Sequence, residues 1–291
     1  MKKISAALLI LLLAASAALA DVTLVDPYAE APGEAAMTEY LAACLEAAWE
    51  EAVDVRHETD DEQAVNLFLS LPGESAALLC SQGAMILSLQ GYTDQDLRKA
   101  LLPVTCVAAS DSCFFLSPAA AEAVPAGTGE ALAAYCEAHP WEMRIVRLVD
   151  ASPADCLTLE ATWDMPVDQS LYVDYAEAAK AAEQGAAELL VLSTAMLPEA
   201  AESYVRFGST GLPGLWQGVF VQRQGADALA ARLAEALPAI CEAPGWQALL
   251  QAGGYTGEMA LDQASFARTV QDLYEDYVRY LTNEGLFFYE E

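Results

Sequence analysis

The residue types that usually carry catalysis or metal binding are scarce in this sequence. It contains two histidines, His57 within an acidic run at 56–62 and His139 before a proline. Since histidine is the commonest general base and metal ligand, two isolated ones disfavour triad hydrolysis and zinc chemistry. The acidic run lacks the alternating carboxylates and central glycine of an EF-hand loop, so we interpret it as a solvated loop.

The short motifs of nucleotide binding and hydrolysis do not occur either. The sequence has no P-loop, no GxGxxG fingerprint, no GxSxG elbow and no HExxH pattern. Paired carboxylates of the glycosidase type remain open in a chain with 43 Asp and Glu, although no particular pair stands out. We therefore expect a protein that is not an enzyme and needs no cofactor or metal. A secreted hydrolase with paired carboxylates is the alternative.

The strongly negative net charge of the chain disfavours polyanionic partners. The 291 residues carry 13 Lys and Arg against 43 Asp and Glu, for a formal net charge of −30. Nucleic acids and anionic membrane surfaces require clustered basic residues, and here the basic residues are scattered. With 55% hydrophobic residues, the chain has enough apolar surface to fold despite its charge. We expect no nucleic-acid partner.

The first twenty residues have the three parts of an export signal. Lys2 and Lys3 give a positive start, residues 6–15 an apolar segment, and residues 18–20 small side chains before Asp21. The sequence therefore predicts a signal peptide at 1–20, cleaved on export to the periplasm or the extracellular space. No cysteine follows the cleavage site to carry a lipid, and we expect no membrane insertion after cleavage.

The seven cysteines form no CxxC pair and mostly lie in apolar runs, where a reduced thiol behaves as a small hydrophobic group. One disulfide is a second possibility. Cys106 and Cys113 flank Ser110–Asp111, which has the composition of a turn between two strands. If those strands pair, the two sulfur atoms could lie close together.

Apolar periodicity predicts alternating strands and helices, which is typical of an α/β protein with a mostly parallel sheet. The C-terminal aromatic residues, among them Tyr274 and Tyr277, recur at helical spacing and indicate packing rather than a binding surface. The expected elements are strands at 22–25, 76–80, 144–149, 186–192 and 215–222, two strands around the turn within 101–117, helices at 34–52, 127–138 and from 227 onward, and a loop at 211–214.

Several motifs follow one another in an informative order. They are the Pro-Tyr-Ala-Glu-Ala-Pro-Gly loop at 27–33, the Pro-Val-Thr segment and its apolar continuation at 103–118, the helix ending in His-Pro at 132–140, Gly-Leu-Pro-Gly and the aromatic strand at 211–220, and Gly-Gly-Tyr at 253–255. From Val22 onward this order resembles the extracytoplasmic solute-binding receptors of the tripartite tricarboxylate transporter family, also called Bug proteins.

The resemblance implies a type II periplasmic-binding-protein fold. Two α/β lobes would be joined by crossover strands, with the C-terminal helices packed on the first lobe. The lobes would comprise residues 21–118 and 217–291 for the first and 119–216 for the second. The implied function is that of a monomeric receptor, which holds a small-molecule solute between the lobes and passes it to membrane permease subunits. A divergent receptor without a transport role is a further alternative.

This sequence departs from the family in the charge of its loops. The family's first two loops are rich in glycine and free of acids, whereas Glu30 and Glu34 stand at the first loop here and acids fill 58–62. A ligand carboxylate would meet like charge there. We predict a cationic, zwitterionic or neutral solute rather than a dicarboxylate or tricarboxylate. Alternatively, Glu30 or Glu34 caps its own helix and points into solvent.

The candidate ligand-binding residues follow predicted strands, because ligands of such sheets bind beyond the carboxyl ends of strands. For Tyr175, core packing is an equal alternative to ligand contact. The candidates are Tyr28, Ala29 and Glu30 after the first strand, Ser81 and Gln82 after the next buried one, Ser152 in the second lobe, and Asp174 and Tyr175 at a segment that resembles the family's Val-Pro-Tyr.

Overall fold

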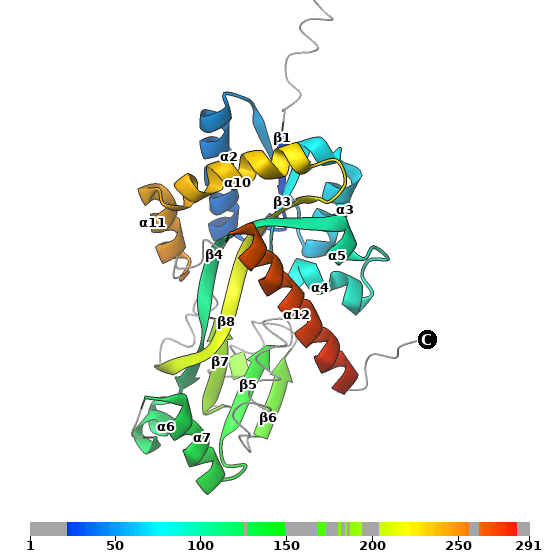
Figure 1. Cartoon of the computed structure of the whole chain (residues 1–291). Helices are drawn as coiled ribbons and strands as arrows, with labels where there is room; N and C mark the ends of the chain where they lie inside the picture. Colours follow the sequence, from blue (N-terminus) through cyan, green and yellow to red (C-terminus); the bar gives the residue numbers. More distant parts are fainter. Residues whose placement is uncertain are drawn as a thin grey trace, which may run out of the picture.

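The computed structural model describes residues 22–124, 127–148, 168–172, 180–181, 184, 187–193, 204–255 and 262–283. The predicted signal peptide lies outside these residues. An eight-stranded sheet runs through the molecule in the order β2-β1-β3-β8-β4-β7-β5-β6 (Figure 1). Its strands are β1 (Val22–Asp26), β2 (Val53–His57), β3 (Ala76–Ser81), β4 (Leu101–Leu116), β5 (Arg144–Leu148), β6 (Asp168–Tyr172), β7 (Leu189–Ser193) and β8 (Val205–Gln222).

The helices begin where the sequence supplies caps. The side chains of Asp60, Ser81, Ser117 and Thr128 each accept a backbone N–H in the first turn of the helix that follows, which satisfies a donor that the helix itself leaves unpaired. The helices are α2 (Pro32–Trp49), α3 (Asp61–Ser70), α4 (Gln82–Gln90), α5 (Leu97–Ala100), α6 (Pro118–Ala123), α7 (Gly129–Ala138), α10 (Asp227–Cys241), α11 (Pro244–Ala252) and α12 (Gln263–Asn283), with a short 3₁₀ turn η1 (Gly73–Ser75).

The sheet and its helices form two lobes. We use lobe 1 for β1, β2, β3, their helices α2–α5, the C-terminal helices α10–α12, and the adjoining halves of β4 and β8. We use lobe 2 for β5, β6, β7, α6, α7 and the other halves of β4 and β8 (Figure 1). This mixed α/β architecture confirms the predicted fold class. The predicted lobe boundaries at 118 and 216 stay a prediction.

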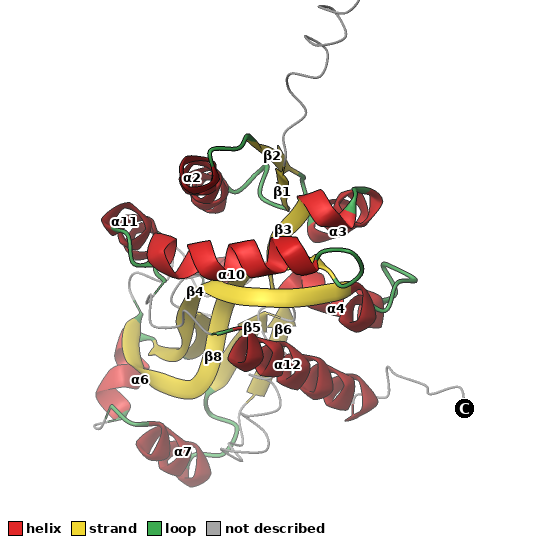
Figure 2. Cartoon of the chain, turned by 45° about the horizontal axis from the view of Figure 1, so that its top comes forward, coloured by secondary structure: helices red, strands yellow, loops and turns green. Residues whose placement is uncertain are grey.

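In lobe 1 the sheet is covered on both faces. Helices α2, α10 and α11 bury Leu41, Leu233 and Trp246 against one face. Helices α3, α4 and α12 cover the other face (Figure 2). Phe68 and Phe266 are buried there. Lobe 2 has its own core, in which α6 and α7 pack on β4, β5 and β7. A sheet that is buried on both faces gives the continuous apolar runs seen in the sequence.

The predicted turn at Ser110–Asp111 is wrong, because both residues lie inside the single strand β4. Buried Ser110 donates its hydroxyl to the carbonyl of Leu215 at 2.9 Å and contacts the hydroxyl of Ser193, so its polarity is satisfied across the sheet. The alternative of a Cys106–Cys113 disulfide fails with the turn. Both thiols are free, and along one strand they lie about 20 Å apart.

The predicted loop at 211–214 is also wrong, because these residues belong to β8, whose Pro213 pairs with Asp111 of β4. Glycine is needed at 214 because the backbones of β8 and β4 approach each other closely there, and not because the chain turns. A Cβ built on Gly214 would lie 2.6 Å from the carbonyl oxygen of Ser110. Register shifts between β4 and β8 on both sides of Asp111 mark bulges, which let long strands bend as they pass from one lobe to the other.

The terminal aromatic residues pack as predicted where the structure describes them. Tyr274 and Tyr277 on α12 are buried, and the Tyr277 hydroxyl accepts a hydrogen bond from Gln90 at 3.1 Å. None of the helices in the described residues is both long and apolar enough to cross a membrane.

Candidate functional site

Polar side chains gather where β1 and β3 end and β8 passes from lobe 2 into lobe 1. The parallel strands β1 and β3 end at the same edge of the sheet, which brings Tyr28 and Ser81 to one side. Strand β8 runs antiparallel to β3 and places Gln217 opposite Ser81. Ligands of parallel sheets bind beyond such strand ends. This edge of lobe 1, facing lobe 2, is the candidate site, and we call it the cleft edge.

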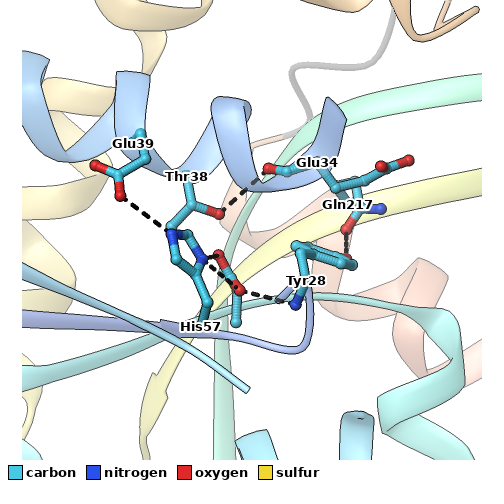
Figure 3. A network of polar contacts seen from close by, with 7 residues as sticks. Tyr28, Glu34, Thr38, Glu39, His57 and Gln217 are labelled. Atoms are coloured by element: carbon cyan, nitrogen blue, oxygen red, sulfur yellow. Dashed lines mark hydrogen bonds and ion pairs between the residues drawn. The ribbon is translucent and has the colours of Figure 1, made fainter. Parts of the chain in front are cut away.

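A histidine between two carboxylates supports the first loop of the cleft edge. The register of β1 and β2 sets His57 beside Asp26, and Nδ1 of His57 lies 2.9 Å from Oδ2 of Asp26. On the other side of the ring, Nε2 lies 3.1 Å from Oε1 of Glu39 on α2 (Figure 3). Burial lowers the pKa of His57, but the hydrogen bonds and charges of Asp26 and Glu39 outweigh it, so the pKa is raised.

This network corrects two interpretations of the acidic run at 56–62. The run is a loop only at residues 58–60, because Arg56 and His57 end strand β2 and Asp61 and Glu62 begin helix α3. His57 is not isolated either. Its contacts are unsuited to triad hydrolysis, because the ring nitrogen that a nucleophile would need contacts Glu39 instead. In the described part of the chain, no group of three or more His, Cys, Asp and Glu side chains could hold a metal ion.

The Tyr28 side chain points into the protein rather than into solvent. It is only 8% exposed, and its hydroxyl donates to Oε1 of Gln217 (Figure 3). Nε2 of Gln217 in turn donates to the Tyr255 hydroxyl at 3.0 Å. Burial raises the pKa of Tyr28 well above its usual value, so its hydroxyl stays a neutral donor. The hydrogen bonds from Tyr28 to Gln217 and from Gln217 to Tyr255 thus connect the first loop and the segment after α11 to β8, the strand that crosses between the lobes.

The backbone donors of the first loop are largely used within the protein. The N–H of Tyr28 donates to the Asp26 carboxylate at 2.9 Å. The N–H of Ala29 donates to the carbonyl of Glu58 at 2.9 Å, and that of Ala31 to the carbonyl of Tyr28 at 3.0 Å. A ligand carboxylate that enters here therefore finds few donors to replace its water.

Ser81 and Gln82 lie at the end of the buried strand β3, as predicted, where helix α4 begins, and both already have partners. The Ser81 hydroxyl oxygen accepts the N–H of Gly83 at 3.3 Å as the cap of α4. Gln82 is 3% exposed, and its Oε1 accepts the N–H of Trp216 at 3.2 Å. Ser81 is partly exposed beside the cleft edge, whereas Gln82 fixes α4 to β8.

Acidic residues surround this edge. Ala29 and Glu30 are exposed, and Glu34 lies in the first turn of α2, near Tyr255. The residue at the N-cap of α2 is Ala31, so neither Glu30 nor Glu34 is the cap residue. On the other side, Asp60, Asp61 and Glu62 line a pocket of about 350 Å³ with Gly83 and Tyr92. Asp61 lies so close to Gly83 that a Cβ there would approach its Oδ2 to 2.7 Å.

The structure brings together the lobe 1 half of the predicted site, formed by Tyr28, Ala29, Glu30, Ser81 and Gln82. The lobe 2 half, which comprises Ser152, Asp174 and Tyr175, lies outside the described residues.

Sequence reasoning missed Asp26, Gln217 and Tyr255, as well as the partners of His57. One signal was available: the apolar alternation Val53-Asp54-Val55 indicates a strand, and a strand there ends at His57 just as β1 ends at Asp26.

No protein-family model matches the sequence, and no curated protein matches it significantly. Solved structures do resemble it. A TctC solute-binding protein from Polaromonas is 14% identical, with a TM-score of 0.70 over 90% of this chain and 98% of that one.

MatC from Rhodopseudomonas palustris with bound malate is 15% identical, with a TM-score of 0.59 over 89% and 98% of the two chains. The periplasmic binding protein BugD is 13% identical, with a TM-score of 0.58 over 91% and 97%. The chain thus has the fold of the TctC and Bug solute-binding proteins. At the level of the fold, these neighbours confirm the resemblance that the sequence motifs indicated.

Proposed function

We propose that this protein is an exported solute-binding receptor. It captures a small polar solute between its lobes and releases it, chemically unchanged, to the permease subunits of a tripartite tricarboxylate-type transporter. The observation that carries the proposal is the position of the polar cluster at the cleft edge. In a fold shared with solute-binding proteins over about 90% of the chain, the cluster lies where the strands of lobe 1 end and β8 crosses between the lobes.

The solute of this receptor is cationic, zwitterionic or neutral. In the first loop the backbone donors that would hold a ligand carboxylate are bound to Asp26, Glu58 and Tyr28. The carboxylates of Glu30, Glu34 and the start of α3 lie around the same edge. Like charges at close range in a partly desolvated cleft oppose an anionic ligand and favour a protonated amine.

The contacts to the solute come from both lobes. Glu30 and Ser81 of lobe 1 are accessible, and Tyr28 shapes the loop through its bond to Gln217. In our proposal, Ser152, Asp174 and Tyr175 supply the lobe 2 side.

Isothermal titration calorimetry of the mature protein, purified without refolding, tests the proposal. The probes are citrate, succinate, putrescine, betaine and a panel of amino acids. We expect saturable binding to at least one amine or zwitterion and none to citrate. Micromolar citrate binding would contradict the proposed solute class, but it would still agree with a receptor function. A solute that is recovered chemically altered after incubation would support the hydrolase alternative instead.

A variant with Glu30→Gln and Glu34→Gln tests the role of the acids. Removal of two nearby charges should weaken binding of a cationic solute about tenfold. Glu46→Gln is the matched control, because Glu46 is exposed farther along α2. Equal affinities of the test variant and the control would show that the acids take no part in solute selection.

A further inference from the structure

A second pocket of lobe 1 lies beneath α12, between this helix, α4, α5 and strands β4 and β8. It has a volume of about 220 Å³. Its apolar walls are Met85 of α4, Leu97 of α5, Pro103 of β4, Phe220 of β8 and Val270 of α12. Along β8 it begins at Phe220 and reaches Arg223 beyond the strand, and six residues of extended chain place Arg223 about 20 Å from Gln217. The pocket is therefore separate from the cleft edge.

Two arginines stand at the rim of this pocket, and the protein holds both in place. Nη2 of Arg223 donates to the carbonyls of Leu101 and Arg98 at 3.0 and 3.3 Å. The guanidinium of Arg98 lies over the ring of Tyr274, 4.1 Å from its centroid. An arginine that is anchored through one nitrogen keeps further donors for a ligand in a fixed direction.

The charge at the rim is unusual for this chain. Most arginines in the described residues have a carboxylate of their own, as Arg56 has Asp54 and Arg232 has Glu51. Arg98, which lines the pocket, shares the carboxylate of Asp96 with the neighbouring Lys99. Arg223 has no carboxylate partner among the residues that the structure describes. The rim is thus locally positive in a protein whose net charge is −30.

The size and chemistry of the pocket define its ligand. An apolar cavity of about 150 Å³ is large enough for benzene, so this one can admit a ring or a short alkyl chain together with a charged head. We propose that the pocket beneath α12 is a second ligand site, which binds a small carboxylate with an apolar body of about the size of a benzene ring. The body packs between Phe220 and Val270, and the carboxylate pairs with Arg223.

Calorimetry with benzoate and hexanoate, compared with benzyl alcohol and benzylamine, tests this second site. We expect the two carboxylates to bind more tightly than the alcohol, and the amine to bind most weakly. Arg223→Gln should weaken benzoate about tenfold, because a charge-assisted bond becomes neutral, and should leave benzyl alcohol unchanged. Arg56→Gln is the control, because it removes an arginine of lobe 1 far from the pocket and should change neither.

Methyl NMR separates this site from the cleft. Benzoate should shift the Met85 methyl signal, which lines the pocket, and leave that of Met143 in the lobe 2 core unchanged. Ala267→Trp, which fills the pocket from α12, should abolish the Met85 shift; thermal melting checks that this variant is folded. Benzoate binding that leaves Met85 unmoved, or that Arg223→Gln does not weaken, would overturn the proposal, and so would the absence of any benzoate binding.

Discussion

At the cleft edge of lobe 1, the N–H groups of Tyr28, Ala29 and Ala31 already have partners within the chain. The pocket beneath α12 instead presents the guanidinium of Arg223, which has no carboxylate partner among the residues that the structure describes. The first loop donates to Asp26 and to two backbone carbonyls. Arg223 donates through Nη2 to two backbone carbonyls. One sheet can therefore carry two surfaces that prefer ligands of opposite charge. A buried acid such as Asp26 acts on the groups beside it, whereas the net charge of the chain acts only at longer range.

The largest expected effect is on the helix that covers the second pocket. We expect the greatest loss of stability when the contact that holds α12 to the sheet is removed. Phe266 is fully buried and packs edge-on against Trp216 at 5.2 Å. Phe266→Ala should lower the free energy of unfolding by about 3–5 kcal/mol, because it leaves a cavity under the helix. Urea denaturation measures the loss. Tyr92→Ala, at a residue 58% exposed, should cost far less; similar losses would mean that α12 is not anchored here.

Removal of the internal acid at the cleft edge comes next. Asp26 is fully buried and accepts from Tyr28 and His57. Asp26→Ala should lower the free energy of unfolding by about 2–3 kcal/mol, because it leaves the N–H of Tyr28 and the ring of His57 without their acceptor. Asp54→Ala is the control on the neighbouring strand, where a more exposed pair with Arg56 is expected to contribute under about 1 kcal/mol. Chemical denaturation of both variants decides whether Asp26 is structural.

A smaller effect is expected at the link from the first loop to the crossover strand. Tyr28→Phe removes the hydroxyl that donates to Gln217 and leaves a buried amide oxygen with one partner fewer. The expected loss is about 1–2 kcal/mol, measured by thermal melting. Tyr274→Phe serves as the control, because it keeps the ring under Arg98 and should be nearly neutral. A neutral Tyr28→Phe would contradict the proposed link.

The smallest expected effect is a pH dependence carried by His57. Because its pKa is raised in the folded protein, protonated His57 stabilises the fold. That contribution is fully present below the unfolded pKa of about 6.5 and is lost as the pH rises through the folded pKa. The difference in Tm between the natural protein and His57→Gln should therefore be larger at pH 5.5 than at pH 8. A constant difference would show that the imidazolium contributes nothing.

The local elements could be predicted where one pattern acted alone. Val22–Asp26 and Ala76–Ser81 are short apolar runs bounded by polar residues, and they form β1 and β3 as expected. The same reasoning failed for β4 and β8. Ser110 and Gly214 are residue types that are common in turns, yet both lie in strands. Ser110 of β4 donates to the carbonyl of Leu215 in β8, and the backbone of Gly214 in β8 approaches that of Ser110 closely. A residue type cannot tell a turn from a close contact between strands.

The sequence by itself determined the α/β class, the acidic character and the position of Tyr28 and Ser81 at the ends of strands, because these follow from periodicity, composition and chain order. Only the tertiary structure decided that Asp26 meets His57, that Gln217 joins Tyr28 to Tyr255, and that Arg223 reaches a pocket beneath α12. Those contacts depend on strand register and on the packing of distant helices, and each joins residues too far apart in the chain for any local pattern to record.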